Sequence, residues 1–184
     1  LKAKKHVFVE KPLCLNYEEG VELKKLANKN NCKLMVGHLL LYHPAFIALK
    51  NIIDSGTIGN IRYIYSNRLS LGKLRKEEDA LWSFAPHDIS MILALIGDEP
   101  VKVQATGGAY LSPNIADTSV TLLSFKKNIK AHIFVSWLHP FKDHKLVVVG
   151  EKAMIAFDDT ALGEKKLTLY KHEASWSDEI PIIH

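Results

Sequence analysis

Two short motifs in the sequence carry side chains that could act on a hydroxyl group, and the first is Glu10-Lys11-Pro12. It follows the β-type run 6–9, so it is expected at the carboxyl end of a parallel strand, where open α/β sheets bind their ligands. A lysine at that edge could contact a reacting hydroxyl and a cofactor together, and Pro12 would hold the turn through a trans or a cis bond. The alternative is an ordinary surface lysine in a turn.

The second motif, Pro86-His87-Asp88, opens a helix that the apolar spacing predicts over residues 86–96. In the first turn of a helix, the dipole favours the neutral imidazole, which can accept a proton. His87 is therefore a candidate general base. The competing interpretation is that Asp88 caps the helix and that His87 is only a polar residue of its first turn.

Motifs for metal binding or for a complete dinucleotide site do not occur in the sequence. His38 and His43 lack a carboxylate partner at metal-ligand spacing, and there is no H-E-x-x-H motif or Cys/His cluster, so we expect no metal. The ten glycines form no G-x-G-x-x-G, no P-loop and no G-x-S-x-G motif. A dinucleotide site would therefore be incomplete in this chain.

The beginning of the chain has the pattern of a βαβ unit. Asn16 stands three residues before Glu19, which is the spacing of a helix cap with its acidic partner, so a helix is predicted from Tyr17 to the run 28–31. Residues 33–37 predict a second buried strand. Two strands joined by a helix form a crossover, and this predicts a parallel sheet.

The remaining chain predicts two helices and a sheet whose neighbouring strands are mostly antiparallel. Helices are expected at residues 44–55 and 86–96, joined by a strand from Ile61 and a charged loop at 73–79. Short turn-like links between the later strands favour hairpins. These later strands are expected at residues 101–105, 119–125, 129–137, 145–149, 154–157 and 166–170.

Composition limits the classes of partner. The 184 residues are 47% hydrophobic and 24% charged, as in a globular domain. The net charge of +4 is spread along the chain without a dense basic block, so nucleic acid is not expected as a partner. His38, His43 and Lys50 interrupt the apolar stretch 34–53, so we expect buried core there and no membrane partner. The two cysteines have no further pair, which indicates a reducing compartment such as the cytoplasm.

Taken in order, the motifs resemble the Gfo/Idh/MocA family of NAD(P)-dependent sugar and cyclitol oxidoreductases. The resemblance covers nearly all of the chain and rests on the runs 7–13, 35–38, 42–45, 56–59 and 85–89. It implies NAD or NADP as the cofactor, bound in part by Glu10, Lys11 and Pro12. It further implies that Lys11 contacts both the substrate and the nicotinamide ribose, and that His87 serves as the acid/base.

The resemblance also implies a fold and its division. Residues 1–37 would be the C-terminal part of the NAD(P)-binding Rossmann domain, and residues 38–184 would be a substrate-binding and oligomerisation domain without its last element. The expected fold class is α/β followed by α+β: a C-terminal remnant of a Rossmann-like domain, then a largely antiparallel open sheet with helices on one face. Because the glycine-rich turn is absent, we expect this polypeptide by itself to be inactive.

Two departures from the family pattern bear on the chemistry. Ser83 stands where the family usually has an aspartate four residues before the histidine, so the resemblance implies no carboxylate-assisted relay and leaves more of the acid/base work to His87 and Lys11. Residues 39–41 replace the usual polar residue and arginine after the second strand. Substrate contacts at that position must therefore differ.

The expected partner is a small-molecule sugar, and the run 82–88 is most similar to members that act on nucleotide-linked amino sugars. A basic cluster on the strand and loop before this run could reach a diphosphate, since arginine forks and lysine point charges both bind phosphate. The cluster consists of Arg68, Lys73, Arg75 and Lys76. The acidic run 77–79 could instead pair with it as a solvated loop.

Aromatic side chains could add flat surfaces for a sugar or a base, although a tryptophan at a strand end is more often simply core. The substrate-binding residues that we predict are Lys11, Tyr42, Arg68, Lys73, Trp82, His87, Trp137 and His139. A free sugar or an inositol-type cyclitol is the alternative substrate. The alternative function is a non-catalytic ligand-binding or assembly module.

One face of a largely antiparallel sheet would remain without helices, and apolar residues on it would need cover. Ile133, Val135, Val147 and Val149 could lie there, which predicts a homo-oligomer formed through the sheet. The alternative is that these residues face the helices of their own domain.

Overall fold

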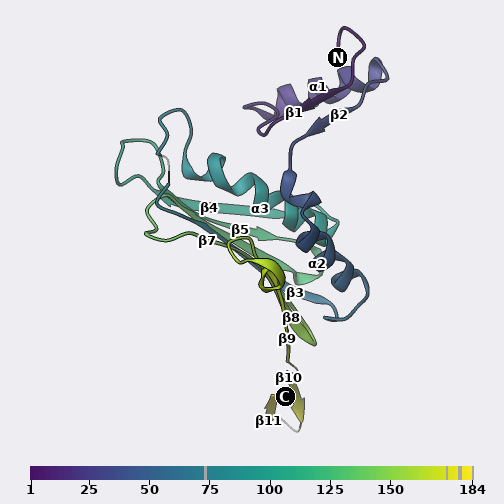
Figure 1. Cartoon of the computed structure of the whole chain (residues 1–184), viewed down its shortest axis with the longest axis vertical. Coiled ribbons are helices and arrows are strands. Elements are labelled where there is room, and N and C mark those ends of the chain that lie inside the picture. Colours follow the sequence, from purple (N-terminus) through teal and green to yellow (C-terminus); the bar gives the residue numbers. More distant parts are fainter. Residues whose placement is uncertain (73, 173, 178–179, 184) are drawn as a thin grey trace. The chain divides into compact units, whose positions relative to one another are not determined.

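The chain consists of two compact units, Leu1–Leu39 and Leu40–His184, in a computed structural model (Figure 1). The structure describes residues 1–72, 74–172, 174–177 and 180–183. Among these residues, no helix is both long enough and apolar enough to cross a membrane.

The first unit is a βαβ element. Strand β1 (Val7–Val9) pairs in parallel with β2 (Leu34–Val36), and helix α1 (Tyr17–Lys29) connects them. The Asn16 side chain accepts a hydrogen bond of 2.9 Å from the backbone N–H of Glu19, which satisfies one of the free donors of the first helical turn. The predicted crossover, its parallel strands and its cap are confirmed.

Two α-helices lie in the second unit, α2 (Pro44–Asp54) and α3 (Ala80–Ile96). A short 3-10 helix, η1 (Leu39–Tyr42), precedes α2. The α2 helix begins with a proline, and His43 Nδ1 caps it by accepting a hydrogen bond of 3.1 Å from the backbone N–H of Ala45. His43 therefore has a structural role at the start of this helix.

Helix α3 begins earlier than the sequence predicted. Its N-cap is Asp79, whose carboxylate accepts a hydrogen bond of 2.9 Å from the backbone N–H of Trp82. Pro86 consequently lies inside the helix and not in its first turn, where proline is more usual. The helix ends at Gly97, whose φ of 72° is a left-handed conformation that glycine adopts without steric cost. The predicted start at Pro86 is wrong, because Asp79 supplies the acceptor that begins the helix.

Seven strands of the second unit form one sheet in the order β4-β5-β6-β3-β7-β8-β9. Each neighbouring pair is antiparallel except β3 with β6, which is parallel. The largely antiparallel sheet is thus confirmed. Its strands are β3 (Ile61–Leu69), β4 (Lys102–Gly108), β5 (Thr118–Ser124), β6 (Lys130–Ser136), β7 (Asp143–Gly150), β8 (Ala153–Asp158) and β9 (Leu167–Lys171).

Smaller elements complete the chain. Strands β10 (Ala174–Ser177) and β11 (Ile180–Ile183) form a separate antiparallel pair. Two short 3-10 turns are η2 (Lys126–Asn128), between β5 and β6, and η3 (Gly163–Lys166), before β9.

One face of the seven-stranded sheet packs against α2 and α3 and forms the core (Figure 1). Ile133 and Val135 of β6 point into this core and are 1% and 0% exposed. Their predicted place on the open face is wrong, because successive residues of a strand alternate between faces and β6 turns His132 and Phe134 away from the helices. The side chains of Ile133 and Val135 therefore stabilise the core of their own domain.

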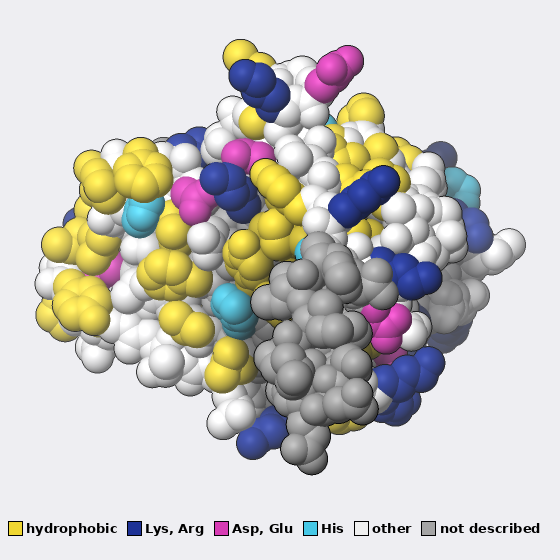
Figure 2. Space-filling view, turned by 90° about the horizontal axis from the view of Figure 1, so that it is seen from below, with side chains coloured by type: hydrophobic (Ala, Val, Ile, Leu, Met, Phe, Trp, Pro, Cys, Tyr) yellow, Lys and Arg dark blue, Asp and Glu magenta, His cyan; other side chains and the backbone are white. Residues whose placement is uncertain are grey.

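The other face of the sheet, called here the open face, lies away from α2 and α3. Val147 and Val149 of β7 are on this face, because the residues that alternate with them point into the core. Tyr63 and Tyr65 of β3 stand beside these two valines in the strand register. Tyr63 is 43% exposed, whereas Val147 and Val149 are 3% and 8% exposed, so the exposed apolar surface of these two strands lies over β3. Hydrophobic side chains gather on the left of the view in Figure 2.

Candidate active site

The Glu10-Lys11-Pro12 turn directly follows β1, at the carboxyl ends of the two parallel strands of the first unit. Gly37 follows β2, and its backbone N–H donates to Val9 O over 2.8 Å. The Glu10 carboxylate lies against this glycine, since a Cβ there would come within 3.1 Å of Glu10 Oε2. The Lys11–Pro12 bond is cis, and Lys11 is half-buried. The absence of a side chain at Gly37 therefore lets Glu10 lie across the strand edge beside Lys11.

His87 lies inside α3, beyond its first turn, and is half-buried with its Nδ1 atom buried. Helix dipole effects fall off within the first turn, so the dipole does not set the protonation state of His87, and that part of the prediction is wrong. Ser83 is buried four residues earlier. Residues at this spacing share one side of a helix, so a hydroxyl and not a carboxylate stands one turn before the imidazole.

Asp88, the next residue, is a buried ion-pair partner and not a helix cap. Its side chain is 1% exposed, and Arg68 donates to it from Nε over 2.6 Å and from Nη2 over 3.3 Å. The Ser66 hydroxyl donates to the same carboxylate over 2.5 Å. Burial raises the pKa of the Asp88 carboxyl, while the charge of Arg68 and the hydrogen bonds oppose that rise. The predicted capping role of Asp88 is therefore wrong.

The predicted basic cluster does not form an exposed patch in the part of the chain that the structure describes. Arg68 is 6% exposed and its guanidinium is engaged in the interior, so it does not reach a phosphate at the surface. Arg75 pairs with Glu78 at 3.0 Å, as the alternative interpretation of this loop expects. Lys76 is exposed, and Lys73 lies outside the described residues.

The predicted aromatic contacts have different surroundings. Trp82 in the first turn of α3 and Tyr42 in η1 are 43% and 61% exposed. His139 follows β6, and its ring packs on Phe141 with 4.3 Å between the ring centroids. Trp137 is 1% exposed and belongs to the core. Its predicted contact with substrate is wrong, because the ring is covered by the protein itself.

A buried carboxylate that the sequence prediction missed organises the loop before β5. Asp117 is 2% exposed and accepts hydrogen bonds from the backbone N–H groups of Tyr110, at 2.5 Å, and Leu111, at 2.9 Å. The carbonyl of Ala116 accepts a hydrogen bond of 2.9 Å from the backbone N–H of Ala80. The loop is thereby joined to the start of α3. An aspartate directly before a strand is the signal that could have indicated this role.

Comparison with known families decides the ancestry of the chain. Residues 46–156, more than half of the sequence, match the GFO/IDH/MocA C-terminal domain, and residues 1–38 match the oxidoreductase family with an NAD-binding Rossmann fold. The chain belongs to the Gfo/Idh/MocA family. This confirms the resemblance, the fold class and NAD as the cofactor of the family's Rossmann domain.

Three relatives illustrate the range of the Gfo/Idh/MocA match. A UDP-N-acetylglucosamine 3-dehydrogenase from Acidithiobacillus ferrooxidans is 30% identical over 132 residues, which are 71% of this chain and 41% of that protein. A solved structure of that enzyme superposes with a TM-score of 0.79 at 26% identity and covers 90% of this chain and 53% of its own. An inositol 2-dehydrogenase from Rhizobium meliloti is 29% identical over 121 residues, 63% of this chain and 37% of the relative.

The third relative, a 2,7-anhydro-N-acetylneuraminate hydratase from Escherichia coli, is 26% identical over 171 residues, 85% of this chain and 46% of that protein. The names of these Gfo/Idh/MocA proteins cover different sugar-related substrates and more than one reaction. The chain spans about half the length of the curated relatives it matches.

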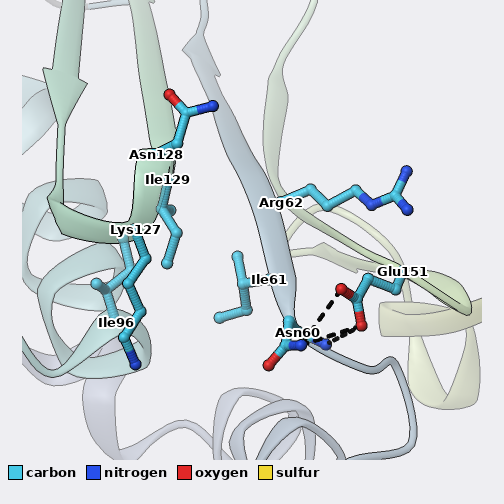
Figure 3. A pocket seen from close by; sticks show the side chains of 8 residues that line it. All are labelled: Asn60, Ile61, Arg62, Ile96, Lys127, Asn128, Ile129 and Glu151. Carbon is cyan, nitrogen blue, oxygen red and sulfur yellow. Dashed lines mark hydrogen bonds between the residues drawn. The ribbon is translucent and has the colours of Figure 1, made fainter.

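A hollow of about 600 Å³ lies where β3 and β6 begin (Figure 3). Its Glu151 carboxylate accepts hydrogen bonds from the Asn60 backbone N–H, at 3.1 Å, and from Asn60 Nδ2, at 3.2 Å. These bonds lower the pKa of Glu151. None of the predicted site residues lines this hollow, so it is not the site that the sequence predicted.

Metal ligands do not gather in the described residues either. No group of three or more His, Cys, Asp or Glu side chains that could hold a metal ion lies together among them.

Proposed function

We propose that this chain forms the catalytic part of an NAD(P)-dependent dehydrogenase that oxidises a hydroxyl-bearing carbon of a sugar. The observation that carries the proposal is the joint match of residues 1–38 to an NAD-binding Rossmann fold and of residues 46–156 to the family's C-terminal domain. We assign residues 1–37 to the cofactor-binding domain and residues 38–184 to substrate binding and oligomerisation.

The residues of the first unit fit the nicotinamide end of the cofactor. The Glu10-Lys11-Pro12 turn stands at the carboxyl ends of β1 and β2, where open α/β sheets bind their ligands, and the Glu10 carboxylate lies against Gly37 at this edge. The sequence has no glycine-rich turn for a pyrophosphate, so we assign only the nicotinamide ribose to this turn. A nicotinamide held there would supply the hydride acceptor for the carbinol carbon.

His87 accepts the hydroxyl proton while the carbon loses its hydride, so that the sugar carbinol becomes a carbonyl. Imidazole can accept and return a proton in neutral solution, and histidine is the side chain that most often serves as a general base. Because Ser83 and not a carboxylate lies one turn before His87, the imidazole takes the proton without a carboxylate relay.

Lys11 donates a hydrogen bond to the same substrate oxygen and stabilises the negative charge that develops on it during hydride loss. The ammonium group also orients the hydroxyl for proton transfer to His87. Lys11 and His87 are therefore the two catalytic residues of the proposal.

The substrate that we favour is a nucleotide-linked amino sugar, and the 30% identity to a UDP-N-acetylglucosamine 3-dehydrogenase supports this choice. The exposed rings of Trp82 and Tyr42, together with His139, are the proposed contacts to sugar or base. Arg68 is left out of the proposal because it is buried. Lys73 stays a prediction for the diphosphate. The inositol 2-dehydrogenase relative supports a cyclitol as the alternative.

We further propose that a second copy of the chain covers the open face. Tyr63 of β3 is 43% exposed and Leu122 of β5 is 49% exposed, and exposed apolar side chains on a sheet face favour association. The free thiols of Cys14 and Cys32 fit a reducing compartment, and we place the protein in the cytoplasm.

The dehydrogenase proposal is tested by joining the nucleotide-binding half of a family relative ahead of residue 1 and following NAD and NADP reduction. UDP-N-acetylglucosamine, free N-acetylglucosamine and myo-inositol serve as substrates. We expect reduction with the UDP-sugar. Reduction with myo-inositol alone would select the cyclitol alternative, and no reduction with a broad panel of sugars and cyclitols would overturn the dehydrogenase proposal.

Calorimetric titration of the 184-residue chain with NAD and NADP tests the alternative of a non-catalytic ligand-binding module. We expect no tight binding, because the sequence lacks the turn that would hold the pyrophosphate. Tight binding by this chain would contradict our assignment of the nicotinamide end alone to it.

A further inference from the structure

Four polar side chains form a connected chain in the interior between α3 and the sheet. Ser66 and Arg68 come from β3, Asp88 from α3 and His144 from β7. Ser66 is 0% exposed, Arg68 6% and Asp88 1%. Hydrogen bonds run from Ser66 and Arg68 to Asp88, and Arg68 Nη1 lies 3.2 Å from His144 Nδ1. The guanidinium is therefore held from two sides.

The contact to Arg68 fixes the protonation of His144. A guanidinium can only donate hydrogen bonds, so Nδ1 of His144 is the acceptor and the ring proton resides on Nε2. Burial lowers the pKa of His144 to about 4, and the charges of Arg68 and Lys142 act in the same direction, while Asp159 and Asp143 oppose them. His144 is consequently neutral near pH 7 and can serve Arg68 as an acceptor.

The Arg68–Asp88 pair contributes more to the orientation of α3 than to the stability of the fold. Apolar residues of similar volume often replace a buried ion pair without loss of stability, so burial of charge is a weak explanation for keeping it. A guanidinium that binds both carboxylate oxygens of Asp88 permits few relative orientations, whereas apolar side chains permit many. The pair therefore fixes both the rotation of α3 about its axis and its height over the sheet.

The Arg68–Asp88 ion pair lies directly beside the proposed base, His87. Asp88 follows His87 in α3, and Phe84 lies one turn before Asp88 on the same side of the helix. The Phe84 ring makes an edge contact with His144, with 6.1 Å between the ring centroids. The middle of α3 is thus attached to β3 through Asp88 and to β7 through Phe84, so His87 projects from a helix segment that cannot rotate freely.

We propose that Arg68 and Asp88 are positioning residues for His87, and that His144 holds the Arg68 guanidinium in the orientation this requires. Neither member of the ion pair contacts the substrate; both act through the backbone of α3. This inference rests on the role given to His87 in the proposed function.

The test compares the wild-type chain with two variants. Arg68→Met/Asp88→Leu removes both charges and is expected to fold, with a melting temperature within about 5 °C of wild type. Arg68→Lys keeps the positive charge but loses the planar guanidinium that binds both carboxylate oxygens of Asp88. Lys50→Gln/Asp54→Asn is the matched control, because it removes an exposed ion pair on α2.

The first measurement uses imidazole proton–nitrogen NMR spectra of the 184-residue chain. Wild type and the Lys50/Asp54 control are expected to give one sharp set of His87 signals. In both Arg68 variants, we expect exchange broadening or several sets of His87 signals, and loss of the Nε2-protonated signature of His144. A folded variant with wild-type His87 signals would overturn the positioning role.

The second measurement uses the same variants in the enzyme joined to a Rossmann half. We expect kcat to fall about tenfold or more with little change in KM, because misplacing a reacting group by a fraction of an ångström slows chemistry more than binding. Unchanged kcat in both Arg68 variants would overturn the proposal. If the wild-type fusion shows no dehydrogenase activity, the proposed function fails, and the NMR measurement still decides whether the ion pair orders His87.

Discussion

Asp88, the residue after the proposed base His87, is bound by Arg68 through a hydrogen bond of 2.6 Å between Nε and Oδ2 in the interior of the second unit. This pair joins the middle of α3 to β3 across a stretch of sequence that contains a charged loop and the start of the helix. Because of this pair, Arg68 does not belong to the surface cluster that the sequence predicted, and Asp88 does not cap the helix. Each of the two buried charges is stabilised by the other.

Removing one charge of this pair is expected to be costly. Arg68→Met should lower the free energy of unfolding by about 3–5 kcal/mol, because the buried Asp88 carboxyl would lose its ion-pair and hydrogen-bond partner. Urea denaturation measures this loss. Lys50→Met is the control, since its 2.7 Å pair with Asp54 is exposed and should contribute no more than about 0.5 kcal/mol. Equal losses of unfolding free energy in Arg68→Met and Lys50→Met would contradict the buried position of the Arg68–Asp88 pair.

The start of α3 can be tested through its cap. Asp79→Ala should lower the free energy of unfolding by about 1 kcal/mol, because the backbone N–H of Trp82 loses its acceptor. Glu99→Ala, at an acidic residue beyond the end of the helix, is the control and should change it by less than about 0.5 kcal/mol. If Asp79→Ala had no effect in thermal or urea unfolding, the helix would begin later, near Pro86.

The pH dependence of stability reports on His144. Its pKa is lowered from 6.5 to about 4 in the folded chain, so the unfolded chain binds the proton first as the pH falls. The stabilisation from the neutral ring is therefore fully present above pH 6.5 and is lost as the pH falls toward 4. His144→Asn keeps an acceptor for Arg68 but does not titrate.

Urea denaturation of both proteins across this pH range separates the His144 effect from other titrations. The wild type should lose stability relative to His144→Asn as the pH falls from 6.5 toward 4. Parallel pH profiles would show that His144 does not titrate with a lowered pKa.

Assembly through the open face is tested by placing a charge on it. Leu122 lies on this face and is 49% exposed, so Leu122→Glu should convert a dimer to a monomer while the sheet stays folded. Val101→Glu, at an exposed position just before β4, is the control and should remain dimeric. Light scattering gives the molar mass, and a monomeric wild type would contradict the proposed partner.

Local signals in the sequence were sufficient where one or two neighbouring residues decide the structure. The Asn16 and Glu19 spacing identified the start of α1, and Pro44 and Gly97 marked the correct ends of two helices. Alternation of apolar residues located the strands of the sheet. These features depend on backbone capping and on burial of one face, and both are written in short stretches of sequence.

Long-range relationships could not be derived in the same way. Arg68 and Asp88 are 20 residues apart, and no local pattern distinguishes a buried arginine from one on the surface. Trp137 and Asp117 are likewise buried by elements distant in the sequence. For α3, the prediction relied on the preference of proline for the first turn and overlooked Asp79 as the N-cap. The predicted helix start was therefore too late, and His87 was wrongly expected to lie close to the positive end of the helix dipole.

In the proposed reaction, His87 is the base that accepts the proton of the substrate hydroxyl. The most direct measurement is the rate of NAD(P) reduction by His87→Gln in the enzyme joined to a Rossmann half, beside a His172→Gln control. We expect His87→Gln to lower kcat by about 100-fold or more without a change in melting temperature, and the control to keep the wild-type rate. A His87→Gln enzyme with the wild-type kcat would contradict it.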